Sequence, residues 1–257
     1  MKNNWIMILL TKPKLYLFTL LKQTIFIGAC LSMMYYLAKY LGMNEQYVPS
    51  SIHGLTGFVI GMLLVFRTST AYERWWEARK LFSNFQSSII YLKTCCPTGD
   101  PEINRMLSSL NSNFFEMISN ENNDSLIGYK KALYTTIHNL RQEYSVKAIC
   151  SSGMDRKFSE IIDIFCSLER IKTTPIPFSY SFHIKISIFA YILSLPFGMF
   201  YSMGPWSILI TMLLFFIIAG IEIISSEIEN PFKGDPNDLP IDSYEEENNM
   251  LINHENK

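Results

Sequence analysis

Residues 53–82 read HGLTGFVIGMLLVFRTSTAYERWWEARKLF, an apolar run that passes directly into an amphipathic one. The apolar part, His53–Phe66, is short for a helix facing lipid, which needs about 20 residues. Gly57 and Gly61 lie four residues apart within it, a spacing that lets neighbouring helices approach closely. We therefore expect a helix that is buried among other helices, and we hypothesise that neighbouring subunits bury it.

Apolar runs also occur on either side of this stretch. They cover Leu15–Leu41, Ile184–Tyr201 and Trp206–Ile224, and together with the first run they predict four transmembrane helices. The region between the second and third spans has helical apolar spacing and no β-alternation of any length. Its predicted helices are Glu102–Ile118, Tyr129–Tyr144 and Met154–Ile171.

The sequence therefore predicts an all-α membrane protein in four parts. Residues 1–82 hold an N-terminal lead-in and transmembrane helices 1 and 2, and residues 83–172 form a helical cytoplasmic region. Residues 173–228 hold transmembrane helices 3 and 4. Residues 229–257 form an acidic cytoplasmic tail, whose end we expect to be poorly ordered.

The basic residues predict the orientation. The loops at about 42–52 and 202–205 contain no Lys or Arg, whereas basic residues precede the first span and follow the second. The positive-inside rule therefore places both termini and the middle region in the cytoplasm of a multi-pass protein in the cell membrane. The net charge of -1 gives no indication of a nucleic-acid partner.

Patterns typical of enzymes are missing from the sequence. It contains no glycine-rich phosphate loop, no HExxH and no GxSxG, and the histidines and the five cysteines are scattered. We expect no enzyme activity and interpret the cysteines as reduced thiols. Glu222, near the end of the fourth run, has two interpretations: a functional intramembrane acid, or an interfacial residue paired with a basic side chain.

Two polar segments next to the spans also carry alternatives. Thr68–Leu81 could be an interfacial anchor of aromatic and basic residues where a helix leaves the membrane. Glu229–Asp242 places Asp235, Asn237 and Asp238 close together. These oxygen donors could bind a hard cation, or the segment could be a proline-rich connector with solvated acids.

Three motifs in order resemble the bestrophin family, particularly its bacterial members. They are FRTSTAYERWWEARKLF at Phe66–Phe82, TTPIPFSY at Thr173–Tyr180 and ENPFKGDPNDLP at Glu229–Pro240. The likeness covers nearly the whole chain, although about 97–165 carries no matching motif. The resemblance implies a homopentamer around one central pore.

The resemblance also implies the pore residues. The neck positions of the family fall on Phe58, Met62 and Phe66, which share one helix face because they are four residues apart. The alternative is that this face packs against the first helix as ordinary core. The cytoplasmic constriction of the family lies by the TTPIP motif, where Ile176 is the first candidate and Thr174 the second.

In animal bestrophins, acids after the fourth helix form a calcium clasp. Asp235 and Asp238 occupy corresponding positions here as a metal site, but Pro236 and Asn237 interrupt the acidic run and lower the charge that drives calcium affinity. We therefore expect a channel that requires no cofactor and is not activated by calcium.

The expected function is a pentameric channel of the cell inner membrane that conducts small monovalent ions, with membrane lipid and copies of itself as partners. The resemblance to bacterial members favours cations such as Na⁺, although no sequence feature fixes the sign of the permeant ion. The alternatives are a calcium-activated anion (chloride) channel, a secondary transporter, and a membrane anchor that presents the cytoplasmic helices.

Overall fold

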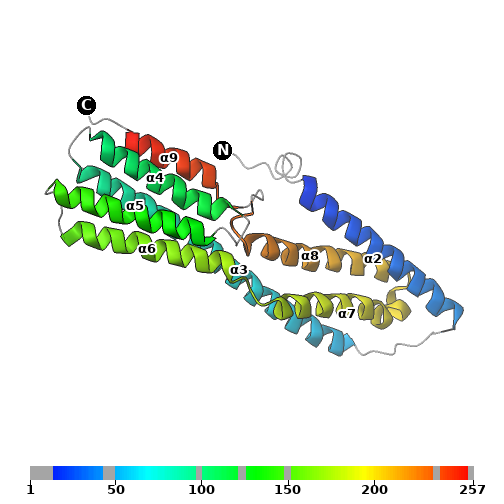
Figure 1. Ribbon diagram of the computed structural model, residues 1–257. Helices are drawn as coiled ribbons and strands as arrows, with labels where there is room; N and C mark the ends of the chain where they lie inside the picture. The colour runs from blue at the N-terminus through cyan, green and yellow to red at the C-terminus, as the bar shows by residue number, and fades with distance from the viewer. Residues whose placement is uncertain are drawn as a thin grey trace, which may run out of the picture. The chain divides into compact units, whose positions relative to one another are not determined.

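The computed structural model describes residues 14–42, 50–96, 100–120, 126–147, 152–233 and 238–253. These residues are helical or lie in turns and short links between helices, which agrees with the predicted all-α class. The helices are α2 (Lys14–Tyr40), α3 (Ser50–Thr94), α4 (Pro101–Ser119), α5 (Leu126–Val146), α6 (Ser152–Thr173), α7 (Phe178–Met203), α8 (Trp206–Ile228) and α9 (Ile241–Asn253) (Figure 1).

The chain forms two compact units. The first, which we call the span unit, comprises residues 1–70 and 176–226, and the second, the bundle unit, comprises residues 71–175 and 227–257. The helix α3 contributes its first half to the span unit and its second half to the bundle unit. Among the described residues, four helices are long and apolar enough to cross a membrane: α2, α3, α7 and α8.

The core of the span unit is aliphatic and draws on all four of these helices. Its buried side chains include Leu31 of α2, Leu64 of α3, Ile192 of α7 and Phe215 of α8. The helix α7 begins at Phe178, earlier than the expected start at Ile184, because Pro177 ends the preceding link and proline is compatible with a helix N-terminus.

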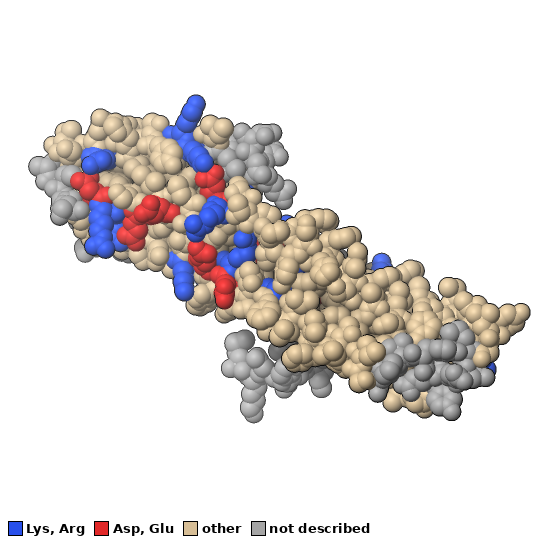
Figure 2. Space-filling model, turned by 90° about the horizontal axis from the view of Figure 1, so that it is seen from below, with Lys and Arg blue, Asp and Glu red and all other residues tan. Residues whose placement is uncertain are grey.

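The core of the bundle unit combines aliphatic side chains with a cluster of stacked aromatic rings. In Figure 1 the helices α4, α5, α6 and α9 lie side by side, and the second half of α3 contributes to their core. Phe85 of α3 stacks on Phe114 of α4 with 3.6 Å between ring centroids, and Phe82 stacks on Phe115. In Figure 2, charged side chains gather on the surface of this bundle, whereas the surface of the span unit in that view is nearly free of them.

We expected the end of the acidic tail to be poorly ordered, and for residues 241–253 this prediction is wrong. Residues 241–253 form α9, which packs on α4. The buried side chain of Asn248 donates a hydrogen bond of 3.0 Å to Asn111, and Asn111 donates one of 3.1 Å to the carbonyl of Glu245. Because both amides are buried, these bonds fix how α9 sits on α4.

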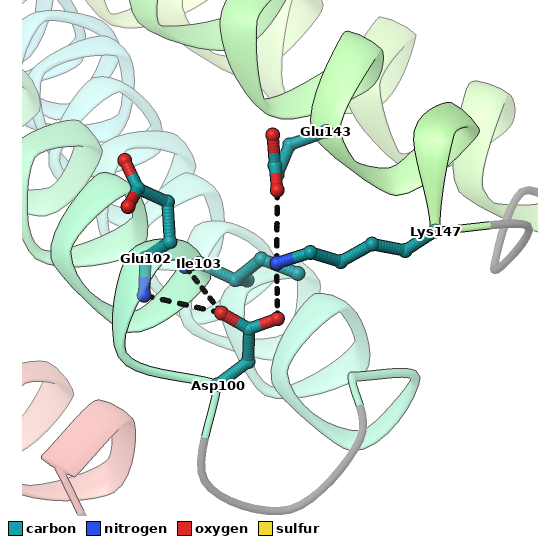
Figure 3. Close-up of polar contacts among 5 residues, drawn as sticks. All are labelled: Asp100, Glu102, Ile103, Glu143 and Lys147. Atoms are coloured by element: carbon teal, nitrogen blue, oxygen red, sulfur yellow. Dashed lines mark hydrogen bonds and ion pairs between the residues drawn. The ribbon is translucent and has the colours of Figure 1, made fainter.

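The N-terminus of α4 is closed by a charged cap. The carboxylate of Asp100 accepts hydrogen bonds from the backbone amides of Glu102 and Ile103, at 3.1 and 3.4 Å (Figure 3). Lys147, directly after α5, reaches Asp100 and also forms an ion pair of 2.8 Å with Glu143. The cap therefore links the start of α4 to the end of α5.

Candidate functional site

The three predicted neck residues lie on one exposed face of α3. Phe58, Met62 and Phe66 are 68%, 45% and 58% exposed, respectively. On another side of the same helix, Ile60 and Leu64 are buried in the core of the span unit. The neck face is therefore apolar and is exposed within this chain, and its place in a pore stays a prediction.

The two glycines of α3 differ in what surrounds them. A side chain at Gly57 would lie 2.5 Å from the hydroxyl oxygen of Tyr191 on α7, so Gly57 allows these two helices of one chain to approach closely. No described atom outside α3 lies within 4 Å of a Cβ built at Gly61. Gly57 therefore has a close neighbour in its own chain, and the burial of this span by neighbouring subunits stays a prediction.

A cluster of charged residues lies next to the neck face, at the turn of α3 that carries Phe66. Arg67 is only 1% exposed, and its guanidinium donates a hydrogen bond of 2.6 Å to Ser181 on α7. The same guanidinium lies 3.5 Å from the carboxylate of Glu222 on α8. Lys185 of α7 lies 3.6 Å from the same Glu222 oxygen.

These contacts bear on one part of the second interpretation of Glu222, its pairing with a basic side chain. It is buried and paired with basic side chains, as the second interpretation expected. A carboxylate and a guanidinium removed from water need such partners, since an uncompensated buried charge is costly. Sequence reasoning missed Ser181 and Lys185, although Arg67 at the end of an apolar run was a signal that such partners exist.

Arg74, in the first bestrophin-like motif, binds three backbone carbonyls from two segments of the bundle unit. Its guanidinium donates hydrogen bonds to the carbonyl oxygens of Ile171 at 2.7 Å, Thr174 at 2.8 Å and Glu229 at 3.3 Å. The planar fork of arginine suits several acceptors at once. The side chain of Glu77, one turn later on α3, forms an ion pair of 3.3 Å with Arg170.

The candidates for the cytoplasmic constriction lie in the short link between α6 and α7. Thr174 is exposed, and its carbonyl is the one that Arg74 holds. Ile176 is half-buried and lies just before Pro177. The boundary between the two units falls between these two candidates, at Pro175.

The acids after α8 are described only in part. Asp238 is half-buried, and Asp235 lies outside the described residues. Within the described ranges, no group of three or more His, Cys, Asp or Glu side chains could hold a metal ion.

The sequence matches one family over nearly its whole length. The family described as Bacterial/Fungal Bestrophin protein matches residues 1–98 and 98–253. The chain belongs to the bestrophin family. This membership explains why its three motifs follow one another in the order that bestrophins show.

Two bestrophin-like relatives illustrate the range of similarity. A voltage-dependent anion channel-forming protein of Nostoc sp. strain PCC 7120 is 33% identical over 226 residues, 74% of this chain and 72% of the relative. A voltage-dependent anion channel-forming protein of Escherichia coli K12 is 22% identical over 236 residues, 79% of this chain and 75% of the relative.

A solved structure confirms the fold of this bestrophin. The crystal structure of a bacterial bestrophin homolog from Klebsiella pneumoniae matches with a TM-score of 0.76 at 18% identity. The match covers 92% of this chain and 97% of the Klebsiella chain. At this identity the likeness establishes the arrangement of the helices rather than the identity of the permeant ion.

Proposed function

We propose that five copies of this bestrophin surround one pore, whose neck is formed by Phe58, Met62 and Phe66 of each copy. The observation that carries this proposal is the exposed apolar face of α3, on a helix whose other side is core. Apolar rings offer no ligands to replace the water shell of an ion, so a narrow ring can lose its water and act as a barrier. The neck would then control whether ions pass more than which ions pass.

The remaining parts of the channel follow from the same arrangement. Ile176, with Thr174 as second candidate, would form the cytoplasmic constriction, and the hydrogen bond from Arg74 would hold that link in place. Both termini and the bundle unit would lie in the cytoplasm, as the basic residues indicate. The channel would conduct small monovalent ions down their gradient and would need no bound cofactor.

Cations and anions are both candidates for the permeant ion. The resemblance to bacterial bestrophins supports cations such as Na⁺. Conduction of anions is the second candidate, because the curated relatives are named voltage-dependent anion channel-forming proteins. The charged groups described nearest the neck face do not choose between them, since Arg67 and Glu222 are buried and paired.

Ion flux through the purified protein in liposomes tests the channel function. A channel gives fast flux without a coupling ion, a secondary transporter saturates with substrate concentration, and a membrane anchor gives no flux. Reversal potentials in planar bilayers with a tenfold NaCl gradient then show whether the permeant ion is a cation or an anion. A cation-selective channel reverses near the Na⁺ equilibrium potential and an anion-selective channel near that of Cl⁻.

A further inference from the structure

Both faces of the proposed pore helix are apolar, so hydrophobicity alone does not decide which face points to the pore. One face carries Phe58, Met62 and Phe66, and the other carries Ile60 and Leu64. In a membrane, lipid tails are as apolar as these side chains, so the hydrophobic effect does not distinguish the two faces, and packing and polar contacts must do so. The bundle core holds the second half of α3, and we ask which polar contact sets the rotation of its apolar half.

The buried charged cluster supplies such an interaction. Arg67 follows Phe66 directly, so the two side chains leave the helix about 100° apart. Arg67 contacts α8 through Glu222 and α7 through Ser181, while Phe66 is exposed. A rotation that buried Phe66 would draw Arg67 away from both partners and leave the charge of Arg67 uncompensated in an apolar surrounding.

We propose that the Arg67–Glu222 ion pair, together with Ser181, fixes the rotation of α3 and thereby keeps Phe66 directed at the pore. Arg67 is then a positioning residue that acts through the neck and does not touch the permeant ion. This inference rests on the proposed channel function, because the exposed face of α3 lines a pore only if the protein is a channel.

Lys185 separates this positioning role from a general role in folding. Its side chain is 55% exposed and lies 3.6 Å from Glu222, so one carboxylate faces two cations. When Arg67 is replaced by a neutral residue, the ammonium of Lys185 still compensates the charge of the Glu222 carboxylate. Loss of Arg67 should therefore release the rotation of α3 before it prevents assembly.

The test measures the rotation of α3 by thiol labelling in a cysteine-free background. Phe66→Cys and Leu64→Cys are introduced singly, the protein is reconstituted in liposomes, and modification by a membrane-impermeant methanethiosulfonate is followed by mass spectrometry. With Arg67 intact, the thiol at position 66 reacts and the thiol at position 64 is protected. With Arg67→Gln, we expect the rate at position 66 to fall at least tenfold and the rate at position 64 to rise.

Three further variants complete the test. Arg67→Lys keeps the charge and should restore the rate at position 66 to within threefold, whereas Lys185→Met should leave both rates unchanged. Glu222→Gln should also lower the rate at position 66 and raise the rate at position 64. It replaces Arg67→Gln in the test if Arg67→Gln does not assemble. Unchanged rates at both thiols in an intact oligomer of either variant would overturn the proposal.

The outcomes for the positioning role and for the channel remain distinguishable. Labelling rates are measured on the protein itself and need no current. A protein that shows the expected shift of reactivity but passes no ions would contradict the channel function and leave the positioning role standing. A thiol at position 66 that does not react with Arg67 intact would refute the water-accessible neck face on which the inference rests.

Discussion

At the residue scale, the two arginines of α3 show what sequence can and cannot predict. Arg74 was singled out by its motif, but its carbonyl partners at Ile171, Thr174 and Glu229 are far from it in sequence. The partners of Arg67 are likewise on other helices. Spacing arguments reach only neighbours within one helix, so contacts of this kind require the fold.

The cap of α4 gives a pH dependence whose sign follows from two pKa shifts. The ammonium of Lys147 and the backbone amides of α4 lower the pKa of Asp100 below its ordinary value of 3.8. The carboxylates of Asp100 and Glu143 raise the pKa of Lys147 above its ordinary 10.5. The contribution of Asp100 is therefore present above pH 3.8 and is lost as the pH falls through its lowered pKa, while that of Lys147 is lost only at strongly basic pH.

We predict that Asp100→Asn lowers the melting temperature at pH 7, because the ion pair to Lys147 is lost. The difference from the unmodified protein should shrink as the pH falls below about 3.8, where the carboxylate becomes protonated in the unfolded state, and should vanish below the lowered pKa of Asp100 in the folded state. Helix melting followed by circular dichroism in detergent measures this. Asp242→Asn, at an exposed position in the first turn of α9, is the control. A difference that stays constant from pH 7 to pH 3 would contradict the assignment.

At the element scale, most helices follow the apolar spacing of the sequence, and the exception is instructive. The helix α9 lies in an acidic segment, and its buried face contains Asn248 between Tyr244 and Ile252. These residues are four apart, which is a helical signal, but a buried asparagine hides it in a count of apolar residues. Only the presence of Asn111 on α4 makes that asparagine suitable for the core.

The two glycines of α3 lead to opposite predictions. Gly57→Ala should lower the stability of the fold relative to Gly61→Ala by about 1 kcal/mol, because the new methyl group would meet the hydroxyl end of Tyr191 on α7 while the gain in helix propensity is common to both variants. Adding Tyr191→Phe removes the hydroxyl and should recover part of this loss. Gly61→Ala would meet no described atom of another helix in its own chain, so it should leave the subunit stable and weaken only a contact between subunits. Melting curves and native mass spectrometry separate the two effects, and equal behaviour of the two variants would argue against this distinction.

At the scale of the whole molecule, the family and the helical architecture could be predicted from the sequence, but the point at which α3 passes from one unit to the other could not. The expected parts ended at residues 82, 172 and 228, whereas the compact units divide after residues 70, 175 and 226, so only the first boundary lies far from the expected one. A continuous helix gives no break in composition at that point, since α3 runs unbroken to Thr94. The path of the ions depends on several copies of the chain, and no single sequence pattern describes it.

The neck remains the central claim, and replacing Phe58, Met62 and Phe66 together by alanine tests it most directly. All three are exposed within the chain, so the subunit should fold and the pentamer should persist, as chromatography and native mass spectrometry can show. Removing the apolar rings should widen the constriction and keep it filled with water, which lowers the barrier to ions. We expect bilayer recordings of the triple variant to show a higher conductance or open probability than those of the unmodified channel. An intact pentamer with unchanged currents would contradict it.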